Sequence, residues 1–335
     1  MAVARTDAVS RENLDAEMLR AMYRHMLRSR VLDERMWVLN RQGRAPFWIS
    51  GMGHEAIQVA VGMNMQPGRD WLAPYYRDLA LTLVLGMTPR DHLLSILARA
   101  EDPNSGGRQM PAHYGSRAHN IISTGSPVTT QLLHAAGIAL AMKMRGDDAV
   151  CVTAIGEGST SGGDFHEALN FAATHRLAVV FVVENNGYAI SVPIQKQMPT
   201  PDVSDRALAY GIPGVNVDGN DAIACYRAAQ EAMERARSGG GPTLLEAKVH
   251  RLTSHSSDDD QRRYRSAEDL AAERGQDCVP HFRAMLEDLG VLGPGDSDSL
   301  RAELVAELDL ATSYAEQAAD PLAETALLHV YADDI

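Results

Sequence analysis

The chain has 335 residues, 45% of them hydrophobic and 22% charged, a composition that is typical of a globular protein and excludes a disordered or fibrous one. A formal net charge of −13 argues against a nucleic-acid binder, which would need a basic face. Three widely spaced cysteines exclude a disulfide framework and a cysteine-rich zinc site, and no apolar run is long enough for a membrane span or a secretory signal, so we expect a cytoplasmic enzyme.

The first predicted elements are helices. Apolar residues recur at helical spacing across 15–41, and further helices are expected at 53–65 and 89–99. Residues 104–126 are rich in Gly, Ser and Asn and predict a long loop, of a kind that often carries function. The following segment, 129–144, is crowded with Ala and Gly and is apolar on nearly all sides, which predicts a buried helix.

The middle of the chain predicts a parallel sheet. Two short apolar runs, 149–155 and 178–183, are typical of buried parallel strands. A helix at 163–174 lies between them and completes a strand–helix–strand crossover. A helix at 222–237 and a strand at 243–249 continue the pattern. The sequence therefore predicts an α/β fold with a parallel sheet flanked by helices.

Helical extensions are expected at both ends, over residues 1–45 and 266–335. Within the second, residues 299–315 place apolar side chains on one stripe, which predicts a surface helix. Since no internal repeat or low-complexity segment is present, residues 1–335 are expected to form a single domain.

The strongest functional signal is Gly156-Glu157-Gly158, followed after the next predicted strand by Asn185-Asn186. The glycines let the backbone approach a ligand, and the next helix directs free amide groups at it. Glu157 and Asn186 follow neighbouring strands and offer hard oxygen ligands, which suit a magnesium ion on a diphosphate. The glycines alone are also compatible with a plain structural turn. A nicotinamide site is disfavoured, because the third glycine and the ribose-binding acid of that fingerprint are missing.

Glycine–acid–glycine with a later Asn pair resembles the thiamine diphosphate-binding motif. From about residue 20 to its end, the chain also resembles the α subunits of bacterial branched-chain 2-oxoacid dehydrogenases. The matching stretches are LAPYYRD (72–78), DPNSGGRQMPAHYG (102–115), TGSPVTTQ (124–131), GEGSTSGGDFHEALNFAA (156–173), ENNGYAISVP (184–193), GNDAIACY (219–226) and RLTSHSSDDDQRRYR (251–265).

This resemblance implies a thiamine diphosphate-binding fold and an oxidoreductase of a multienzyme complex. Such a subunit takes part in the oxidative decarboxylation of branched-chain 2-oxoacids on thiamine diphosphate, and the acyl group passes to a lipoyl acyltransferase. Pyruvate and acetoin dehydrogenase α subunits share the architecture and remain alternatives. An alternative from another functional class is a non-catalytic subunit that binds magnesium diphosphate or has a regulatory role. The intact motifs disfavour this alternative.

The resemblance also implies residue roles. Magnesium would be held by Glu157, Asn186 and the backbone carbonyl of Tyr188. The residues implied in cofactor binding are Tyr75, Tyr76, Arg77, Ser126, Val128, Gly156, Glu157, Gly158, Ser159, Asn186, Tyr188 and His255. A structural potassium ion would lie at Gly125, Pro127, Thr130 and Gln131.

Some of these roles can be weighed from the residues themselves. Arg77 on a polar loop suits a two-pronged contact with a diphosphate. His255 lies in a loop rich in Ser and Asp; it is either a solvated loop histidine or, as the motif favours, a catalytic histidine that binds phosphate or assists proton transfer. The acidic run 258–260 is either a solvated face or part of a loop ordered around the cofactor, with Arg251 and Arg265 neutralising it.

Aromatic residues near these motifs leave two readings open. Phe47, Trp48 and Tyr75 line an apolar pocket for the acyl group, or they belong to the ordinary core. His113 and Tyr114 leave the same choice.

The expected chemistry requires a partner chain. Activation of thiamine diphosphate needs a glutamate at its aminopyrimidine ring, and in two-chain members of the family the β subunit supplies it. No glutamate of this chain matches that residue. The resemblance therefore implies a β subunit, in an assembly of two α and two β chains, and the helix at 130–144 is a candidate interface element.

Overall fold

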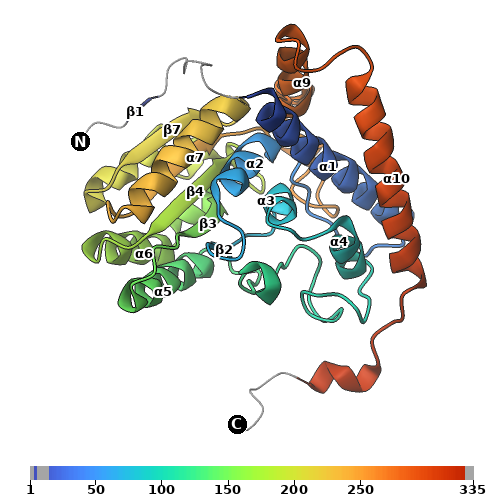
Figure 1. Ribbon diagram of the computed structural model, residues 1–335, viewed down its shortest axis with the longest axis horizontal. Coiled ribbons are helices and arrows are strands. Elements are labelled where there is room, and N and C mark those ends of the chain that lie inside the picture. The colour runs from blue at the N-terminus through green and yellow to red at the C-terminus, as the bar shows by residue number, and fades with distance from the viewer. Residues whose placement is uncertain (1–3, 6–14, 329–335) are drawn as a thin grey trace.

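The computed structural model describes residues 4–5 and 15–328, and its centre is a six-stranded sheet (Figure 1). All of its strands are parallel, in the order β1-β7-β8-β4-β3-β2. These strands are β1 (Ala4–Arg5), β2 (Trp71–Ala73), β3 (Cys151–Gly156), β4 (Val179–Asn185), β7 (Gly214–Asp218) and β8 (Thr243–Lys248). A separate antiparallel pair consists of β5 (Tyr188–Ala189) and β6 (Val192–Pro193). The parallel strands predicted at 149–155, 178–183 and 243–249 are confirmed.

Helices cover both faces of the sheet (Figure 1). The α-helices are α1 (Ala16–Arg41), α2 (Glu55–Asn64), α3 (Leu79–Val84), α4 (Pro89–Ile96), α5 (Thr130–Arg145), α6 (Gly163–Thr174), α7 (Ala222–Arg237), α8 (Ala267–Arg274), α9 (Cys278–Asp288) and α10 (Asp296–Gln317). The 3₁₀ turns are η1 (Arg117–His119), η2 (Glu157–Ser161), η3 (Ile194–Lys196), η4 (Ser204–Tyr210), η5 (Gln261–Arg263) and η6 (Ala323–Leu327). The predicted helices are confirmed, although α4 ends early because Ala98 takes a left-handed φ of 52°.

The strands are apolar along their whole length because the sheet is buried on both faces. In β4 every residue is buried, and successive side chains point to opposite faces. Val180 and Val182 pack in one core with α2 and α7, whereas Phe181 and Val183 pack in a second core with α5 and α6.

Sequence periodicity missed the shortest elements. The strand β2 has 3 residues and the helix α3 has 6, too few to establish a period. The strand β7 is only partly apolar, and α8 buries none of its residues. A complete apolar stripe is therefore absent from β7 and α8, although α8 lies within the helical extension that was expected at 266–335.

The burial expected for the helix at 129–144 is wrong for one face. The helix α5 buries residues such as Leu132 and Ala139 against the sheet and α6. Its other side is exposed, including Gly137 and Ala141, and Met144 is 80% exposed. Burial within the described chain therefore does not account for the apolar residues on this face.

The helices of the two predicted extensions pack together. Met22 of α1, Phe282 of α9 and Leu304 of α10 share one apolar cluster. The expected ranges 1–45 and 266–335 include residues 1–3, 6–14 and 329–335, which lie outside the described residues. None of the helices in the described part of the chain is long and apolar enough to cross a membrane.

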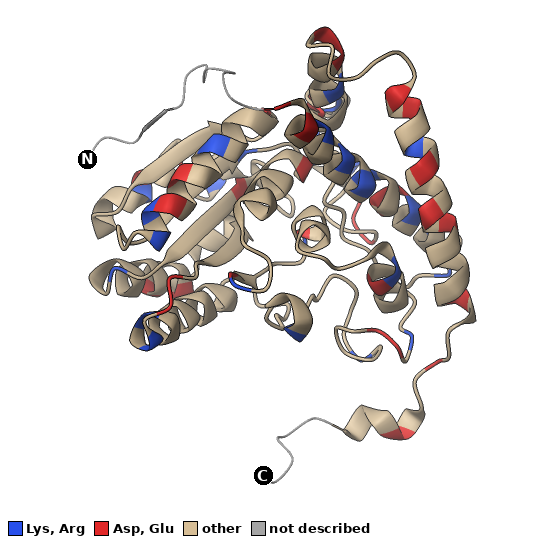
Figure 2. Ribbon diagram, in the orientation of Figure 1, with Lys and Arg blue, Asp and Glu red and all other residues tan. Residues whose placement is uncertain are grey.

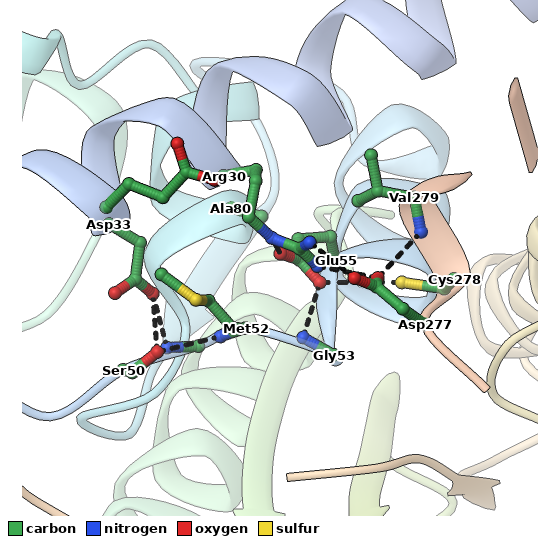
Figure 3. Close-up of polar contacts among 12 residues, drawn as sticks. Arg30, Asp33, Ser50, Met52, Gly53, Glu55, Ala80, Asp277, Cys278 and Val279 are labelled. Carbon is green, nitrogen blue, oxygen red and sulfur yellow. Dashed lines mark hydrogen bonds and ion pairs between the residues drawn. The ribbon is translucent and has the colours of Figure 1, made fainter. Parts of the chain in front are cut away.

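Charged residues are frequent along the neighbouring helices α1 and α10 (Figure 2), and several of them form ion pairs between the two helices. The pairs are Arg24–Glu303, Arg28–Glu307, Arg35–Asp309 and, in the reverse sense, Glu34–Arg301. Solvent screens these partly exposed pairs, so they contribute little. A buried trio differs from them: Arg30 of α1 donates to Glu55 of α2 at 2.7 Å and to Asp277, which precedes α9, at 2.6 Å (Figure 3). This trio joins three helices, and removing Arg30 would leave the buried carboxylate of Glu55 without a positive partner.

Candidate functional site

A cavity of about 430 Å³ lies at the carboxyl edge of the sheet. The strands β3 and β4 pair in register up to this edge, with Gly156 opposite Glu184. Ligand sites of open α/β sheets lie at this edge, because the loops that follow the strands converge there. The cavity is lined by Phe47, Ile49, Tyr75, Tyr76, Arg77, Met110, His113, Ser126, Val128, Gly156, Glu157, Gly158, Ser159, Asn186, Tyr188, Ala189, Ile190 and His255.

Every residue that the resemblance implies in cofactor binding lies on the wall of this one cavity. These residues come from segments far apart in the sequence: 75–77 after β2, 126–128 before α5, 156–159 at the end of β3, 186–188 after β4, and His255 beyond β8. The parallel topology brings these segments to the same edge.

Glu157 is a buried carboxylate on the cavity wall. It is 2% exposed, and it accepts hydrogen bonds from the Asn186 backbone N–H at 3.2 Å and from the Gln197 amide at 3.4 Å. Burial raises the pKa of the Glu157 carboxyl, although these hydrogen bonds and the charge of Arg251 oppose the shift. A cation bound at Glu157 would favour its ionised form.

The oxygen donors next to Glu157 suit a shared metal site. Asn186 is 8% exposed, and its side-chain oxygen accepts a 3.3 Å hydrogen bond from the Tyr188 N–H. Within residues 4–5 and 15–328, no group of three or more His, Cys, Asp and Glu side chains could hold a metal ion alone. One carboxylate, one amide oxygen and one backbone carbonyl instead fit magnesium that takes its other ligands from a diphosphate.

Arg77 brings a buried positive charge to the cavity. Its side chain is 2% exposed and lies over the Tyr76 ring, with 5.3 Å from the guanidinium carbon to the ring centre. The guanidinium donates to the Ser50 carbonyl and lies 3.4 Å from His255 Nδ1. Both of these partners are neutral groups, so an anion in the cavity would be the charged partner of Arg77.

His255 is held as a neutral imidazole. Burial lowers the pKa of His255 to about 4, and the charges of Arg77 and Arg251 add to the shift, against the opposing charge of Asp259. The backbone N–H of His255 donates to Asp259 at 2.8 Å, and its ring packs edge-on against Tyr76. A neutral histidine beside a guanidinium is able to gain a proton when an anion enters.

The expected pairing of the acidic run 258–260 with Arg251 and Arg265 is not direct. Arg251 donates to the Tyr264 hydroxyl, which in turn donates to Asp259. Arg265 pairs with Glu273, and the exposed Arg262 pairs with Asp260. Tyr264 therefore links Arg251 to the acidic run, whereas Arg265 pairs outside it.

The aromatic residues divide between the two readings left open by the sequence. Phe47, Tyr75 and His113 line the cavity. Trp48 and Tyr114 are core residues, 1% and 2% exposed.

The segment expected to hold potassium lies beside the cavity. Gly125, Pro127, Thr130 and Gln131 do not contribute to its walls, but Ser126 and Val128 between them do. The Gln131 amide donates at 3.1 Å to the carbonyls of Val128 and Ala154, which holds this segment against β3.

Sequence reasoning missed a polar network behind the wall. Glu184 is 1% exposed; its Oε2 accepts from the Tyr75 hydroxyl at 2.6 Å and from the Gln58 amide at 3.1 Å, and lies 2.6 Å from His54 Nδ1. Gln58 also donates to the Arg77 carbonyl at 2.9 Å. The available signal was the acidic residue that ends an otherwise apolar strand; nothing local distinguishes His54 or Gln58.

Gly158 is required by packing between two segments of the site. A Cβ at Gly158 would lie 2.5 Å from the Cβ of Ala189, whereas one at Gly156 would meet nothing within 4 Å. The second glycine of the motif therefore lets η2 pack against β5, which brings Glu157 close to Tyr188.

Comparisons with known proteins agree with this geometry. The model of the dehydrogenase E1 component family matches residues 23–324. Over 311 residues, the chain is 49% identical to the 2-oxoisovalerate dehydrogenase subunit alpha of Bacillus subtilis, an alignment that covers 93% of this chain and 94% of that relative. It is 40% identical over 279 residues to the 3-methyl-2-oxobutanoate dehydrogenase subunit alpha of Mycobacterium tuberculosis, and this alignment covers 83% of this chain and 73% of that relative. It is 34% identical over 324 residues to the pyruvate dehydrogenase E1 component subunit alpha of Staphylococcus aureus, and this alignment covers 96% of this chain and 84% of that relative.

Proposed function

The chain belongs to the dehydrogenase E1 component family, and from that premise we propose that it is the α subunit of a branched-chain 2-oxoacid dehydrogenase that depends on thiamine diphosphate. The observation that carries this proposal is a single cavity that joins a buried carboxylate, Glu157, to a buried guanidinium, Arg77. Such a pair suits a ligand that carries both a cation and a polyanion, as magnesium diphosphate does.

The residues on the walls have complementary tasks in this proposal. Glu157, Asn186 and the Tyr188 carbonyl hold magnesium. Tyr76, Arg77, Gly158, Ser159 and His255 contact the diphosphate, and backbone groups of Ser126 and Val128 meet the aminopyrimidine ring. What supports this assignment is that all of these residues line the same cavity.

Thiamine diphosphate, when bound, supplies the nucleophilic carbon and the electron sink for loss of carbon dioxide from a 2-oxoacid. The chain itself contributes position and charge. Arg77 neutralises the diphosphate, and His255 is close enough to Arg77 to hold a proton at the same anion. Phe47, Ile49 and Met110 form an apolar wall that suits a branched aliphatic side chain and excludes water.

The cavity lacks a second acid. Of the described residues that line it, Glu157 alone carries a carboxylate, and its proposed role is metal binding. The glutamate that activates the cofactor is therefore assigned to a β subunit, in an assembly of two α and two β chains that passes its acyl group to a lipoyl acyltransferase. The exposed apolar face of α5 is the surface we assign to contact with another subunit.

A potassium ion at Gly125, Pro127, Thr130 and Gln131 completes the proposal. The Gln131 amide already fixes the Val128 carbonyl. An ion in this segment would hold Ser126 and Val128 in place on the wall.

The test is decarboxylation by the chain co-purified with its β subunit, with thiamine diphosphate, magnesium and an artificial electron acceptor. We expect a higher kcat/KM for 3-methyl-2-oxobutanoate than for pyruvate. A preference for pyruvate would assign the chain to the pyruvate type. Tight binding of thiamine diphosphate without turnover of any 2-oxoacid would support a non-catalytic binding subunit instead.

A further inference from the structure

Residues 47–51 form an extended strap between the cavity and the core. Burial alternates along it: Phe47 and Ile49 are partly exposed and line the cavity, whereas Trp48 and Ser50 are buried on the other side. Such alternation is typical of extended backbone, in which successive side chains point in opposite directions. A group that holds the buried side of the strap therefore also sets the position of the cavity side.

Asp33, in the middle of α1, holds the buried side (Figure 3). It is 1% exposed and accepts three hydrogen bonds from the strap. Its Oδ1 accepts from the Trp48 indole N–H at 2.8 Å, and its Oδ2 accepts from the Ser50 hydroxyl at 3.0 Å and the Gly51 N–H at 2.7 Å. All three groups are donors, so the ionised carboxylate satisfies them together.

The strap is in turn joined to two other walls of the cavity. The Arg77 guanidinium donates to the Ser50 carbonyl, and a Cβ at Gly51 would lie 2.8 Å from the Arg77 carbonyl oxygen. Trp48 is hydrogen-bonded twice to Ser257: its N–H donates to the Ser257 hydroxyl at 3.1 Å, and its carbonyl accepts from the Ser257 N–H at 2.8 Å. Ser257 follows His255 in the same loop.

We infer that Asp33 is a positioning residue, which acts through the strap 47–51 to place the Arg77 guanidinium and the His255 loop around the diphosphate. This inference rests on the proposed function, since it concerns how the chain binds thiamine diphosphate. Asp33 is not among the residues that line the cavity.

The charge of Asp33 is costly, which favours a role beyond stability. Burial raises the pKa of Asp33 to about 7, and the charge of Glu55 adds to the shift, although the three hydrogen bonds oppose it. Because this pKa lies above the ordinary value, ionisation of Asp33 lowers folding stability, increasingly as pH rises towards 7. Below pH 7 the carboxyl takes up a proton, which competes with one of the three donors.

The groups that face Asp33 are few among the described residues. Glu55 of α2 is the charged one, and it is held by Arg30, which also binds Asp277. The phenol of Tyr114 is a titratable neighbour: burial raises the pKa of Tyr114, and the charge of Asp33 contributes. None of these groups donates to Asp33, so the strap supplies its hydrogen bonds.

Asp33→Asn is the informative variant, with Asp70→Asn as its matched control. The amide that replaces the carboxylate of Asp33 keeps the size of the side chain but turns one acceptor into a donor, which faces a donor of the strap. Asp70 is also an aspartate 2% exposed, and it accepts from the Gln66 N–H, the Val150 N–H and Arg237. It lies at the amino edge of the sheet, away from the cavity, so both variants disturb a buried carboxylate but only one disturbs the strap.

The measurement is calorimetric titration of the α–β complex with thiamine diphosphate and magnesium between pH 6 and pH 8, together with the thermal midpoint of each variant. We expect Asp33→Asn to weaken cofactor binding by about tenfold or more, and Asp70→Asn to lower the midpoint without changing the affinity. As the pH falls below 7, the affinity of the wild type for the cofactor should decrease more than the affinity of Asp33→Asn does. The pH dependence that remains in Asp33→Asn belongs to the cofactor and to other groups.

A second measurement follows the wild type itself and uses a variant only to assign a resonance. The indole N–H resonance of Trp48, assigned by its loss in Trp48→Phe, should shift with pH near 7 as Asp33 titrates. The inference is wrong if Asp33→Asn and Asp70→Asn both lose stability and keep wild-type affinity, or if that resonance does not titrate. No binding of thiamine diphosphate by the wild-type complex would instead contradict the proposed function.

Discussion

At the scale of single residues, the cavity depends on groups whose ordinary behaviour burial has changed. Glu157 has a raised pKa, and His255 has one lowered to about 4. Arg77 places its guanidinium where water is almost excluded. Each of these shifts is one that a bound cation or anion would reverse, and this is the physical mark of a site for a charged ligand.

Glu157→Gln should weaken magnesium-dependent binding of thiamine diphosphate by about tenfold or more. The change keeps the shape of the side chain but removes the single negative charge that the chain offers to the cation. Calorimetry on the α–β complex at several magnesium concentrations measures the effect. Equal affinity of variant and wild type at limiting magnesium would remove Glu157 from the metal site.

Binding of the cofactor should draw a proton from solution at His255. Without the cofactor the imidazole is neutral above about pH 4, since burial and two arginines lower its pKa. A diphosphate beside it favours the protonated form and raises this pKa. Between about pH 4 and the pKa reached in the complex, binding should therefore take up protons.

Titrations in buffers of different ionisation enthalpy count these protons. His255→Gln should bind with fewer protons taken up at pH 6 than the wild type does. The same proton uptake in both proteins would assign it to another group.

At the scale of elements, the site is built by contacts between short segments that follow strands. The turn η2 and the strand β5 meet where Gly158 faces Ala189. The strap 47–51 lies between α1 and the cavity. The α-helices hold these segments in place, but none of the described residues that line the cavity belongs to an α-helix.

Gly158→Ala should lower stability by about 1–3 kcal/mol and weaken cofactor binding. The added methyl group would overlap the side chain of Ala189 and force η2 away from β5. Thermal denaturation of the variant complex measures the first effect, and calorimetry the second.

Gly163→Ala, in α6, is the control for this variant, because a Cβ at Gly163 would meet nothing within 4 Å. It should leave both stability and binding near wild type. A Gly158→Ala protein as stable as this control would show that the contact with Ala189 is not tight.

At the scale of the whole molecule, the chain contains only part of the site that the proposed function requires. Of the described residues that line its cavity, one carries a carboxylate, whereas the proposed function needs two acids, one for the metal and one for activation. The helix α5 exposes Gly137, Ala141 and Met144, and exposed apolar surface often marks a contact with another chain.

The isolated α chain should therefore bind thiamine diphosphate weakly and decarboxylate no 2-oxoacid. Without a carboxylate at the aminopyrimidine ring the proton transfer that activates the cofactor has no acceptor, however well the diphosphate is held. The measurement is decarboxylation with an artificial electron acceptor by α alone, by β alone and by the mixture. Activity should require both chains, and turnover by highly purified α alone would contradict the two-chain proposal.

The order of strands and helices was determined by the sequence itself, because apolar periodicity is a local property. The helix expected at 163–174 forms as α6, and its buried residues, Phe165, Ala168, Leu169 and Ala172, have the spacing of one helical face. The motif of the site could also be predicted from local sequence, because Gly156-Glu157-Gly158 and Asn186 lie directly at the ends of two predicted strands. Family resemblance, rather than spacing, extended the site to Arg77 and His255.

Tertiary structure decided what depends on proximity between distant segments. Trp48 and Phe47 are adjacent aromatics, yet one is core and the other lines the cavity, because Asp33 holds only one side of the strap. Glu184 and Gln58 support the wall through contacts that no local pattern encodes. A hydrogen bond between residues far apart in the chain, and the pKa shift that burial causes, exist only once the sheet has brought its loops to one edge.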